Sequence, residues 1–328
     1  MKKITKFSFF ILPFIILNCK KSLEPISQPT WHLIYNAPTD GNYHDIFFVN
    51  QNKGWVVGDS AKILHTGDGG NTWEIQESEG RKVISLYSIY FTDSQIGWAV
   101  GDDHEIIRTT NSGKSWIDVT PPLPQYILRL NSVYFINRQN GWIAHNRGNI
   151  LYTKDGGNTW NGGVVGWELD LLSVYFIDEM KGWTIAKNNI VFNTIDGGIT
   201  WNQQQIYNIS CDSSSSFNDV IFVDDRNGWI STSSKNVNNA NIYHTNNGGQ
   251  EWFCQVSLSD TNLNSIHFIN KNTGWVVGNK IFHTRDGGSS WELQYNSSDD
   301  KFVSISFVDD THGWVLSSKG KVYKYEVH

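Results

Sequence analysis

Short apolar stretches separated by polar turns run along the chain from residue 30 onward, and they recur in a fixed order. The first complete unit predicts strands at 45–49, 55–57, 62–66 and 73–76. Each stretch is too short for a helix and is bounded by Asn, Asp and Gly, which are turn formers. Four short strands joined by tight turns predict one small antiparallel sheet per unit.

A Gly-Trp pair marks the second predicted strand of every unit. The seven tryptophans of these pairs are Trp55, Trp98, Trp142, Trp183, Trp229, Trp275 and Trp314. Successive members are separated by 43, 44, 41, 46, 46 and 39 residues. A period of this size, with four strands in each repeat, is typical of the blades of a β-propeller.

A second motif, T-x-[DN]-x-G-x-[ST]-W, joins the third predicted strand to the fourth in the first six units, and only Glu251 departs from it. Its acid or amide can accept hydrogen bonds from the backbone of the turn, and its Gly permits a positive φ. The side chains at this position are Asp68, Asn111, Asp155, Asp196, Asn247 and Asp286. We interpret them as structural turn residues, not as catalytic carboxylates or calcium ligands.

The two ends of the repeat region complete one another. After Trp314 the sequence predicts only the middle strands of a last unit, at 315–317 and 322–325. The missing outer strand is supplied by Thr30–Ile34, which has the Thr-Trp start of the other fourth strands. The predicted fold class is therefore all-β: a seven-bladed β-propeller of four-stranded antiparallel blades over residues 30–328, closed by the N-terminal strand.

The two motifs together resemble the Asp-box, or bacterial neuraminidase, repeat. The combined form F-x-[DN]-x-x-x-G-W…T-x-D-G-G-x-T-W is most similar to the photosystem II stability/assembly factor family of propellers, throughout residues 30–328. The resemblance implies a propeller that helps to assemble a membrane complex. Because one fold hosts many functions, the function still has to be argued from a site.

The composition removes several classes of function. With 18% charged residues and a net charge of −6, the chain has no basic domain suited to nucleic acid. Fourteen of the fifteen tryptophans belong to the two motifs and are expected to pack the blades. His65, His244 and His283 occupy one register position on different blades, so no metal site is expected. No cofactor is expected either.

The N-terminus has the features of an export signal. Lys2, Lys3 and Lys6 precede an apolar run from Phe7 to Leu17 that is too short to span a bilayer. We predict a signal peptide at 1–18, lipidation of Cys19 as in a bacterial lipoprotein, and a tether at 19–29. The chain would then be held at the inner or outer membrane of the cell envelope, facing the periplasm or the cell surface.

Two further cysteines, Cys211 and Cys254, follow in the propeller. In an oxidising compartment they could form a disulfide, but two cysteines in so large a domain are not a disulfide framework. The register places them at opposite ends of neighbouring outer strands, which disfavours a bridge.

The start of each innermost strand carries a small polar side chain. This ring consists of Asp45, Ser88, Ser132, Ser173, Asp219, Ser265 and Ser304, and it is expected to line the central channel. Hydrogen bonding between blades is the favoured interpretation of the ring. Asp45 and Asp219 are its members to test for a cation or a polar ligand.

The two faces of the disc differ in sequence. The Gly-Trp turns and the Thr-Asp turns share one face, and the more variable loops share the other, where binding is more often built. The unusual residues of the variable loops gather on blades 2 to 4, and aromatic residues with arginines are typical of binding hot spots. The candidates for partner or ligand binding are Arg81, Tyr126, Arg129, Arg147, Trp167, Glu168 and Asp170.

Two classes of function follow from these features. The first is a non-catalytic, lipid-anchored and monomeric propeller that binds a protein or a membrane complex. The alternative is a sialidase-type glycoside hydrolase, with arginines clamping a carboxylate and an acid among Glu168, Asp170 and Tyr126, or a propeller that binds glycans as an adhesin. A concave pocket where Arg81, Arg129 and Arg147 converge on an acid would favour the enzyme.

Overall fold

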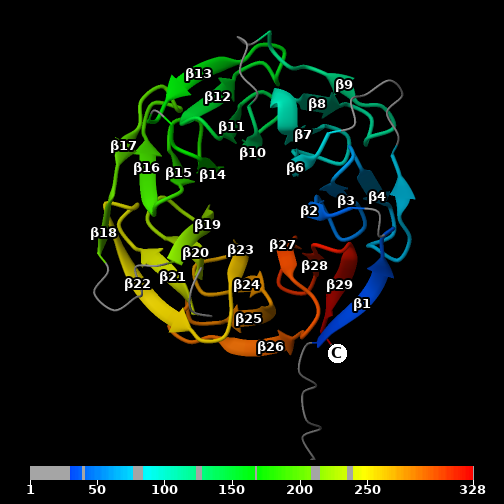
Figure 1. Cartoon of the computed structure of the whole chain (residues 1–328), viewed down its shortest axis with the longest axis vertical. Helices are drawn as coiled ribbons and strands as arrows, with labels where there is room; N and C mark the ends of the chain where they lie inside the picture. The colour runs from blue at the N-terminus through cyan, green and yellow to red at the C-terminus, as the bar shows by residue number, and fades with distance from the viewer. Residues whose placement is uncertain are drawn as a thin grey trace, which may run out of the picture.

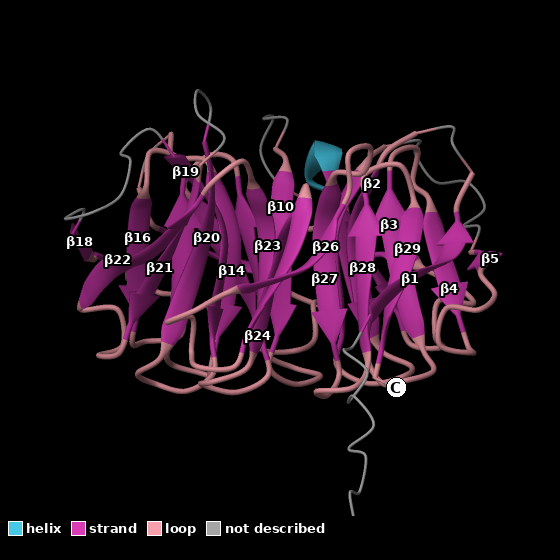
Figure 2. Cartoon of the chain, turned by 90° about the horizontal axis from the view of Figure 1, so that it is seen from below, coloured by secondary structure: helices cyan, strands magenta, loops and turns pink. Residues whose placement is uncertain are grey.

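The computed structural model describes residues 30–38, 41–76, 84–122, 128–166, 168–207, 215–234 and 239–327. Seven small sheets stand around a central axis like the blades of a propeller (Figure 1). In the side view the disc has turns on one face and longer loops on the other (Figure 2). The predicted signal, lipidation site and tether at 1–29 lie outside the described residues.

Each blade consists of an inner strand at the axis followed by three strands toward the rim. Blade 1 contains β2 (Tyr43–Phe48), β3 (Gly54–Gly58), β4 (Ile63–Thr66) and β5 (Glu74–Ile75). Blade 2 contains β6 (Leu86–Phe91), β7 (Gly97–Gly101), β8 (Ile106–Thr109) and β9 (Ile117–Asp118), with a short 3-10 turn, η1 (Asp102–His104), after β7. Blade 3 contains β10 (Leu130–Phe135), β11 (Gly141–His145), β12 (Asn149–Thr153) and β13 (Asn161–Val164). Blade 4 contains β14 (Leu171–Phe176), β15 (Gly182–Ala186), β16 (Ile190–Thr194) and β17 (Asn202–Gln203).

The remaining blades follow the same plan with two variations. Blade 5 contains β19 (Ser215–Phe222), β20 (Gly228–Ser234), β21 (Ala240–Thr245) and β22 (Glu251–Leu258), and β18 (Gln205–Tyr207) adds a fifth strand, parallel to β22. Blade 6 contains β23 (Leu263–Phe268), β24 (Gly274–Gly278), β25 (Lys280–Thr284) and β26 (Glu292–Asn296). Blade 7 contains β27 (Phe302–Phe307), β28 (Gly313–Ser317), β29 (Lys321–Glu326) and β1 (Thr30–Asn36).

The predicted closure of the ring is confirmed. β1 pairs antiparallel with β29, and Thr30 lies opposite Glu326. Trp31 is buried, and its indole Nε1 donates a hydrogen bond to Oε1 of Gln294 in blade 6 at 3.1 Å. The N-terminal strand therefore completes blade 7 and also contacts the blade before it.

A phenylalanine at the end of each inner strand explains why both motifs end in tryptophan. Each Phe ring stacks on the Gly-Trp tryptophan of the preceding blade, with centroids 3.5 to 3.7 Å apart. The same Phe meets the outer-strand tryptophan of its own blade edge-on, at 5.6 to 6.1 Å. The edge-on arrangement is favourable for aromatic rings, and the stacked pairs bury apolar ring faces between neighbouring blades. Trp31 takes the second role in blade 7, so all fourteen motif tryptophans pack the blades as predicted.

The glycine of the Gly-Trp pair is required by this packing. At Gly141 a Cβ atom would lie 2.3 Å from the ring of Phe135, so any side chain there would push the ring off its tryptophan. The preceding blade's Trp98 stacks on the other side of Phe135 at 3.6 Å. Trp98 also donates from Nε1 to the carbonyl oxygen of Gly156 at 3.1 Å, which ties blade 2 to the turn of blade 3.

The Thr-Asp turn is held by hydrogen bonds of its own side chains. In blade 3 the Asp155 carboxylate accepts hydrogen bonds from the backbone N–H of Thr159 at 2.9 Å and from its hydroxyl at 2.7 Å. The hydroxyl of Thr153 donates to the same carboxylate at 2.8 Å. Gly156 has a φ of 73°, which explains the glycine at that position. Burial alone would raise the pKa of Asp155, but these hydrogen bonds outweigh it and lower the pKa.

A glutamine three residues after the outer tryptophan gives a further contact between blades. Gln204, between β17 and β18, accepts a hydrogen bond from Nε1 of Trp252 at 3.0 Å and donates to the carbonyl oxygen of Gly248 at 3.3 Å. Both partners belong to blade 5. At Gln204 the chain passes from the rim of blade 4 to the rim of blade 5. The next residues form β18, which pairs with β22.

Cys254 on β22 is disulfide-bonded. Cys211 lies outside the described residues, so the expectation about a bridge between these two cysteines stays a prediction.

Candidate functional site

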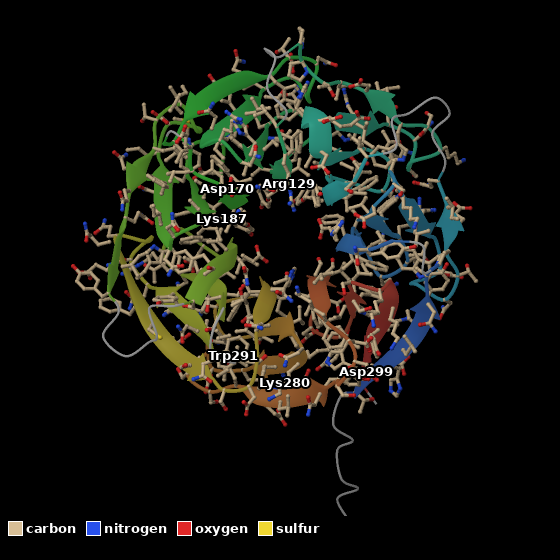
Figure 3. The ribbon with its side chains drawn as sticks, viewed as in Figure 1. Arg129, Asp170, Lys187, Lys280, Trp291 and Asp299 are labelled. Carbon is tan, nitrogen blue, oxygen red and sulfur yellow. The ribbon has the colours of Figure 1, made fainter. Side chains whose placement is uncertain are left out.

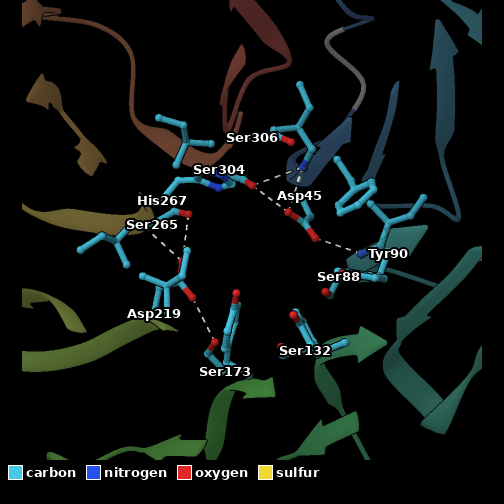
Figure 4. Close-up of a pocket in the computed structure, with 18 of the residues that line it drawn as sticks. Asp45, Ser88, Tyr90, Ser132, Ser173, Asp219, Ser265, His267, Ser304 and Ser306 are labelled. Atoms are coloured by element: carbon cyan, nitrogen blue, oxygen red, sulfur yellow. Dashed lines mark hydrogen bonds between the residues drawn. The ribbon is translucent and has the colours of Figure 1, made fainter. Parts of the chain in front are cut away.

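The central channel holds a cavity of about 330 Å³, lined by the seven inner strands (Figure 4). The predicted polar ring lines it: Asp45, Ser88, Ser132, Ser173, Asp219, Ser265 and Ser304. The sequence register therefore placed all seven side chains correctly.

The ring side chains join neighbouring blades, as the favoured interpretation predicted. The Asp45 carboxylate accepts hydrogen bonds from the backbone N–H of Ile89 in blade 2 at 2.9 Å and from the hydroxyl of Ser304 in blade 7 at 2.7 Å. The serines do the same with one hydroxyl: the Ser88 oxygen accepts from the N–H of Val133 at 3.2 Å. Ring side chains thereby tie blade 7 to blade 1 and join blades 1 to 6 in succession.

Asp219 is the second carboxylate of the ring. Its two oxygens accept hydrogen bonds from the hydroxyls of Ser173 and Ser265, each at 3.0 Å. They also accept from the backbone N–H groups of Val220 at 2.9 Å and Ile266 at 3.1 Å. Four donors occupy this carboxylate, so its main role is to join blades 4, 5 and 6.

The environment of the channel disfavours charge on both carboxylates. Burial raises the pKa of Asp45 to about 6, against the hydrogen bonds that favour its ionised form. Burial also raises the pKa of Asp219. The negative charge of Asp219 adds to the shift at Asp45, so the two groups disfavour each other's ionisation.

This shift gives a prediction for stability against pH. Because the folded-state pKa of Asp45 lies above its unfolded value near 4, ionisation of this residue destabilises the fold as pH rises from about 4 to about 6. Replacement by Ser, the residue of most blades at this position, should remove this loss, which we expect to be roughly 2–3 kcal/mol. Urea unfolding of the wild type and of Asp45→Ser at pH 4.5 and pH 7 measures the difference.

Asp45→Asn provides the companion measurement. The amide nitrogen cannot accept the hydrogen bond from Ile46 or Ile89, so this variant should be less stable than wild type at pH 4.5. Because an amide does not ionise, its stability should also lack the loss between pH 4.5 and pH 7 that is expected for wild type. An unchanged pH dependence in Asp45→Ser would show that the carboxylate ionises freely in the channel.

Aromatic side chains line the end of the channel nearest the motif turns. Phe47 and Tyr90 lie 4.8 Å apart, Tyr90 and Tyr134 5.0 Å apart, and Tyr134 and Tyr175 4.6 Å apart, measured between ring centroids. Burial raises the pKa of Tyr134 well above its usual value. Across the channel, burial lowers the pKa of His267 to about 4, so this imidazole is neutral at pH 7. The end of the channel nearest the motif turns is thus aromatic and uncharged.

A β-bulge in every inner strand shapes the opposite end of the channel. In blade 2 the pairing of β6 with β7 shifts register between Leu86 and Ser88, and Tyr87 is the residue left over. A bulge redirects the side chain of its extra residue. The extra residues of the seven blades are His44, Tyr87, Asn131, Leu172, Asn218, Asn264 and Val303, and they line the mouth on the loop face.

Arg129 is the best-positioned of the predicted binding residues. Its guanidinium lies 3.7 Å from the ring centroid of Tyr87, a close cation–π contact that joins blade 3 to blade 2. The Tyr87 hydroxyl donates to Oδ2 of Asp102 at 3.0 Å. Arg129 itself is exposed, so one side of its guanidinium faces solvent on the loop face. Figure 3 shows it beside the channel mouth, near Asp170 and Lys187.

The network continues from Tyr87 into blade 1. The His44 ring lies 4.8 Å from that of Tyr87, and its Nε2 is 2.8 Å from Oδ1 of Asp59. Partial burial alone would raise the pKa of Asp59, but hydrogen bonds from His44, Asn42 and Ser85 hold it well below the usual value. Sequence reasoning missed Tyr87, His44 and Asp59. An aromatic or imidazole side chain at the bulge position, where three other blades have Asn, is the signal that could have found Tyr87 and His44.

The loops of blades 3 and 4 that carry Arg147 and Glu168 are joined to each other. The carbonyl oxygen of Gly148 accepts hydrogen bonds from the N–H of Val165 at 2.9 Å and of Gly166 at 3.0 Å. Arg147 and Glu168 are both exposed at this junction, and Glu168 has a φ of 62°. These two predicted residues therefore share one surface. Arg81, Tyr126 and Trp167 lie outside the described residues.

Asp170 has a partner that bears on the enzyme alternative. Its carboxylate forms an ion pair with Nζ of Lys187, which sits above blade 4. Arg129 is directed onto Tyr87 rather than toward this carboxylate. The described part of the loop face thus gives no convergence of Arg129 and Arg147 on a free acid. The described residues also contain no group of three His, Cys, Asp or Glu side chains that could hold a metal ion.

The sequence matches one family model, described as photosynthesis system II assembly factor YCF48, over residues 24–124, 79–165, 164–261 and 253–323. A photosystem II assembly lipoprotein, Ycf48, from Prochlorococcus marinus is 40% identical over 81 residues, which is 23% of this chain and 24% of that protein. Its counterpart from Thermosynechococcus vestitus is 32% identical over 74 residues, which is 21% of each protein. These alignments span about a quarter or less of the curated relatives.

Solved structures agree in fold along nearly the whole chain. A structure of YCF48 bound to a D1 peptide has a TM-score of 0.74 and 20% identity, covering 92% of this chain and 98% of that chain. An inactive virginiamycin B lyase from Staphylococcus aureus, solved with quinupristin, has a TM-score of 0.74 and 14% identity, covering 92% of this chain and 100% of that chain. At these identities the likeness concerns the fold alone, which here serves two different activities.

Proposed function

The chain belongs to the photosynthesis system II assembly factor YCF48 family, and from this membership we propose that it is a non-catalytic binding protein that assists the assembly of a membrane protein complex. The partner would be an exposed peptide segment of such a complex; the related propeller was solved bound to a D1 peptide. We also propose that its Thr-Asp turns are Asp-box repeats.

The observation that carries this proposal is the exposed Arg129 on the ring of Tyr87. A guanidinium fixed on an aromatic ring loses little freedom when it binds, and its outward N–H groups can pair with a carboxylate or with backbone carbonyls of a peptide. Arg147, Glu168 and the Asp170–Lys187 pair surround it with charges of both signs. Such a surface suits a polypeptide with mixed polar groups.

The location follows from the N-terminal sequence and from the relatives. Two of the curated relatives are lipoproteins by name, and the Cys19 context supports the same modification here. Among the described residues, no helix has the length and hydrophobicity to cross a bilayer. We therefore propose an acyl anchor at Cys19, a tether at 19–29 and a monomeric propeller in the cell envelope.

The enzyme alternative has less support from the site. A glycosidase needs a free acid placed against its substrate, whereas Asp170 is paired with Lys187. Binding of a glycan without hydrolysis stays a second candidate, because the tyrosines of the channel offer stacking surfaces.

Affinity capture from native membranes tests the proposal. Lipidated wild type, Arg129→Ala and the control Arg138→Ala are cross-linked and purified, and bound proteins are quantified by mass spectrometry. Arg138 is an exposed arginine on the turn face, paired with Asp93 at 2.7 Å. Loss of a central arginine should weaken retention of the partner about tenfold or more, while Arg138→Ala should leave it unchanged.

The opposite result would contradict the proposal. It consists of two observations: the two variants retain the same proteins, and the purified protein hydrolyses a sialoside reporter. Together these observations would favour the hydrolase over the binding function.

A further inference from the structure

Blade 4 exposes three large apolar side chains on the turn face. The exposed fractions are 51% for Met180, 65% for Ile195 and 53% for Ile199. Met180 lies in the turn between β14 and β15, and the two isoleucines lie in the Thr-Asp turn. The two turns touch, because the N–H of Gly197 donates to the carbonyl oxygen of Met180 at 2.9 Å. We call these three residues the blade 4 tip.

The other blades place polar residues or glycine at the same positions. The counterparts of Met180 are Asn52, Gln95, Gln139, Arg226, Asn272 and Thr311. The counterparts of Ile195 are Gly67, Thr110, Lys154, Asn246 and Arg285, and those of Ile199 are Asn71, Lys114, Asn158, Gln250 and Ser289. The turn itself therefore does not require apolar residues at these positions. Exposing a cluster of apolar side chains to water is unfavourable, so the cluster needs another explanation.

The charged groups around the blade 4 tip are already engaged within the protein. The Asp196 carboxylate accepts hydrogen bonds from the N–H and the hydroxyl of Thr200 at 2.9 and 2.6 Å. Glu179 accepts from Nδ2 of Asn140 at 3.0 Å, and Lys181 lies 3.8 Å from Asp225. An apolar tip with paired charges around it fits an electrically neutral, apolar medium better than a charged surface.

The chain also enters the propeller on this face. β29 follows the loop-face turn after β28 and ends on the turn face, and Thr30 lies beside Glu326 at that end. Figure 2 shows the C-terminus on the turn side of the disc, opposite the loops around β10 and η1. Ten residues lie between Cys19 and Thr30, so the backbone of Cys19 can lie no more than about 40 Å from that of Thr30.

β1, which begins at Thr30, and β16, which leads into the Thr-Asp turn of the blade 4 tip, lie on opposite sides of the ring (Figure 1). Two contacts at opposite edges of one face would set that face parallel to the bilayer. A lipid anchor commonly works together with a second membrane-binding element.

We propose that the turn face lies against the lipid bilayer, and that Met180, Ile195 and Ile199 enter its interfacial layer. This rests on the proposed lipidation of Cys19. The loop face, with Arg129 and Tyr87, then points away from the anchoring lipid toward the exposed segments of a partner. The orientation thus assigns one face to lipid and the other to protein.

Photo-cross-linking to lipid tests the orientation with the full lipidated chain. The protein is reconstituted into phosphatidylcholine vesicles that contain a diazirine-labelled phosphatidylcholine, and cross-linked residues are mapped by mass spectrometry. We expect cross-links at 180, 195 and 199 and none at Lys187 or Arg147. The variant Met180→Gln, Ile195→Lys, Ile199→Asn gives blade 4 the residues of blade 3, so the turn should fold normally, and its cross-link yield should fall severalfold.

The control variant is Ile75→Thr, Ile117→Thr, which removes exposed apolar residues from the rim of blades 1 and 2, where they are 58% and 55% exposed. Its cross-link pattern should equal that of wild type. Two results with vesicle-bound protein overturn the proposal. One is an equal lipid cross-link yield in wild type and the blade 4 variant, and the other is cross-linking of lipid to the loop face. If the blade 4 tip cross-links to protein in native membranes and does not cross-link to lipid in pure vesicles, its occupant is a protein. That result also overturns the proposal.

Failure of the proposed function gives a different result. If the chain does not float with vesicles, the anchor and this orientation both fail, whereas loss of partner capture by Arg129→Ala would still support the binding surface. If partner capture fails but the blade 4 tip cross-links to lipid, only the proposed function is lost.

Discussion

Replacing Trp98 with Ala should destabilise the propeller by about 3–5 kcal/mol, the range for removal of a fully buried aromatic side chain. Trp98 is 0% exposed, and its ring stacks on Phe135 of the next blade at 3.6 Å. Its Nε1 also donates to the carbonyl oxygen of Gly156 at 3.1 Å. The variant therefore leaves a cavity between two blades and an acceptor without its donor. The midpoint and slope of urea unfolding, followed by circular dichroism, measure the loss.

Two comparisons separate the contributions to this loss. Trp98→Phe keeps a stacked ring but loses the hydrogen bond to Gly156, so it should cost less than the alanine variant. The Nε1 of Trp55 is buried and has no hydrogen-bond partner among the described residues, so Trp55→Phe should cost less than Trp98→Phe. Equal losses in both phenylalanine variants would show that the indole hydrogen bond contributes nothing.

Removal of β1 should abolish the folded ring. A chain that starts at residue 37 lacks Trp31, leaves Phe307 without its edge-on partner and exposes the whole edge of β29. An unpaired strand at the end of an open ring is a site for association with other chains. We expect this chain to aggregate or to lose its cooperative unfolding transition, as measured by size-exclusion chromatography and thermal denaturation.

The matched chain starts at residue 30 and keeps β1 while removing residues 1–29. It should remain a soluble monomer with the unfolding transition of the mature protein. Restoring β1 as a separate peptide of residues 30–36 should partly recover the fold of the shortened chain. A chain from residue 37 that unfolds cooperatively and stays monomeric would show that six complete blades and three strands are stable alone.

The repeat predicts most of the fold because each motif residue has one structural role. Phe, Gly and Trp at fixed spacing are required by a single aromatic stack that recurs in every blade. The partial units at the two ends predicted the pairing of β1 with β29. The channel ring could also be predicted, since strand register places equivalent residues at equivalent depth.

The sequence could not show the features that depend on departures from the repeat. Tyr87 and His44 follow the alternation of a regular strand poorly, because each is the extra residue of a β-bulge. β18 has no motif of its own, and it pairs with β22 directly after Gln204, which bonds to blade 5. For the candidate site, the face and the blades were predicted, but the contact of Arg129 with Tyr87 requires the three-dimensional structure.

The placement of β1 has a consequence for how such a chain can arise by duplication. Along the chain the propeller begins with the outer strand β1 and ends with the three other strands of the same blade, so a tandem array with this offset leaves one outer strand at its start and three strands at its end. These two unequal ends together complete one blade, and no additional strand is needed. An array with one unit more or fewer would still have matching ends, so a change in blade number needs only a change in curvature and no new closing element.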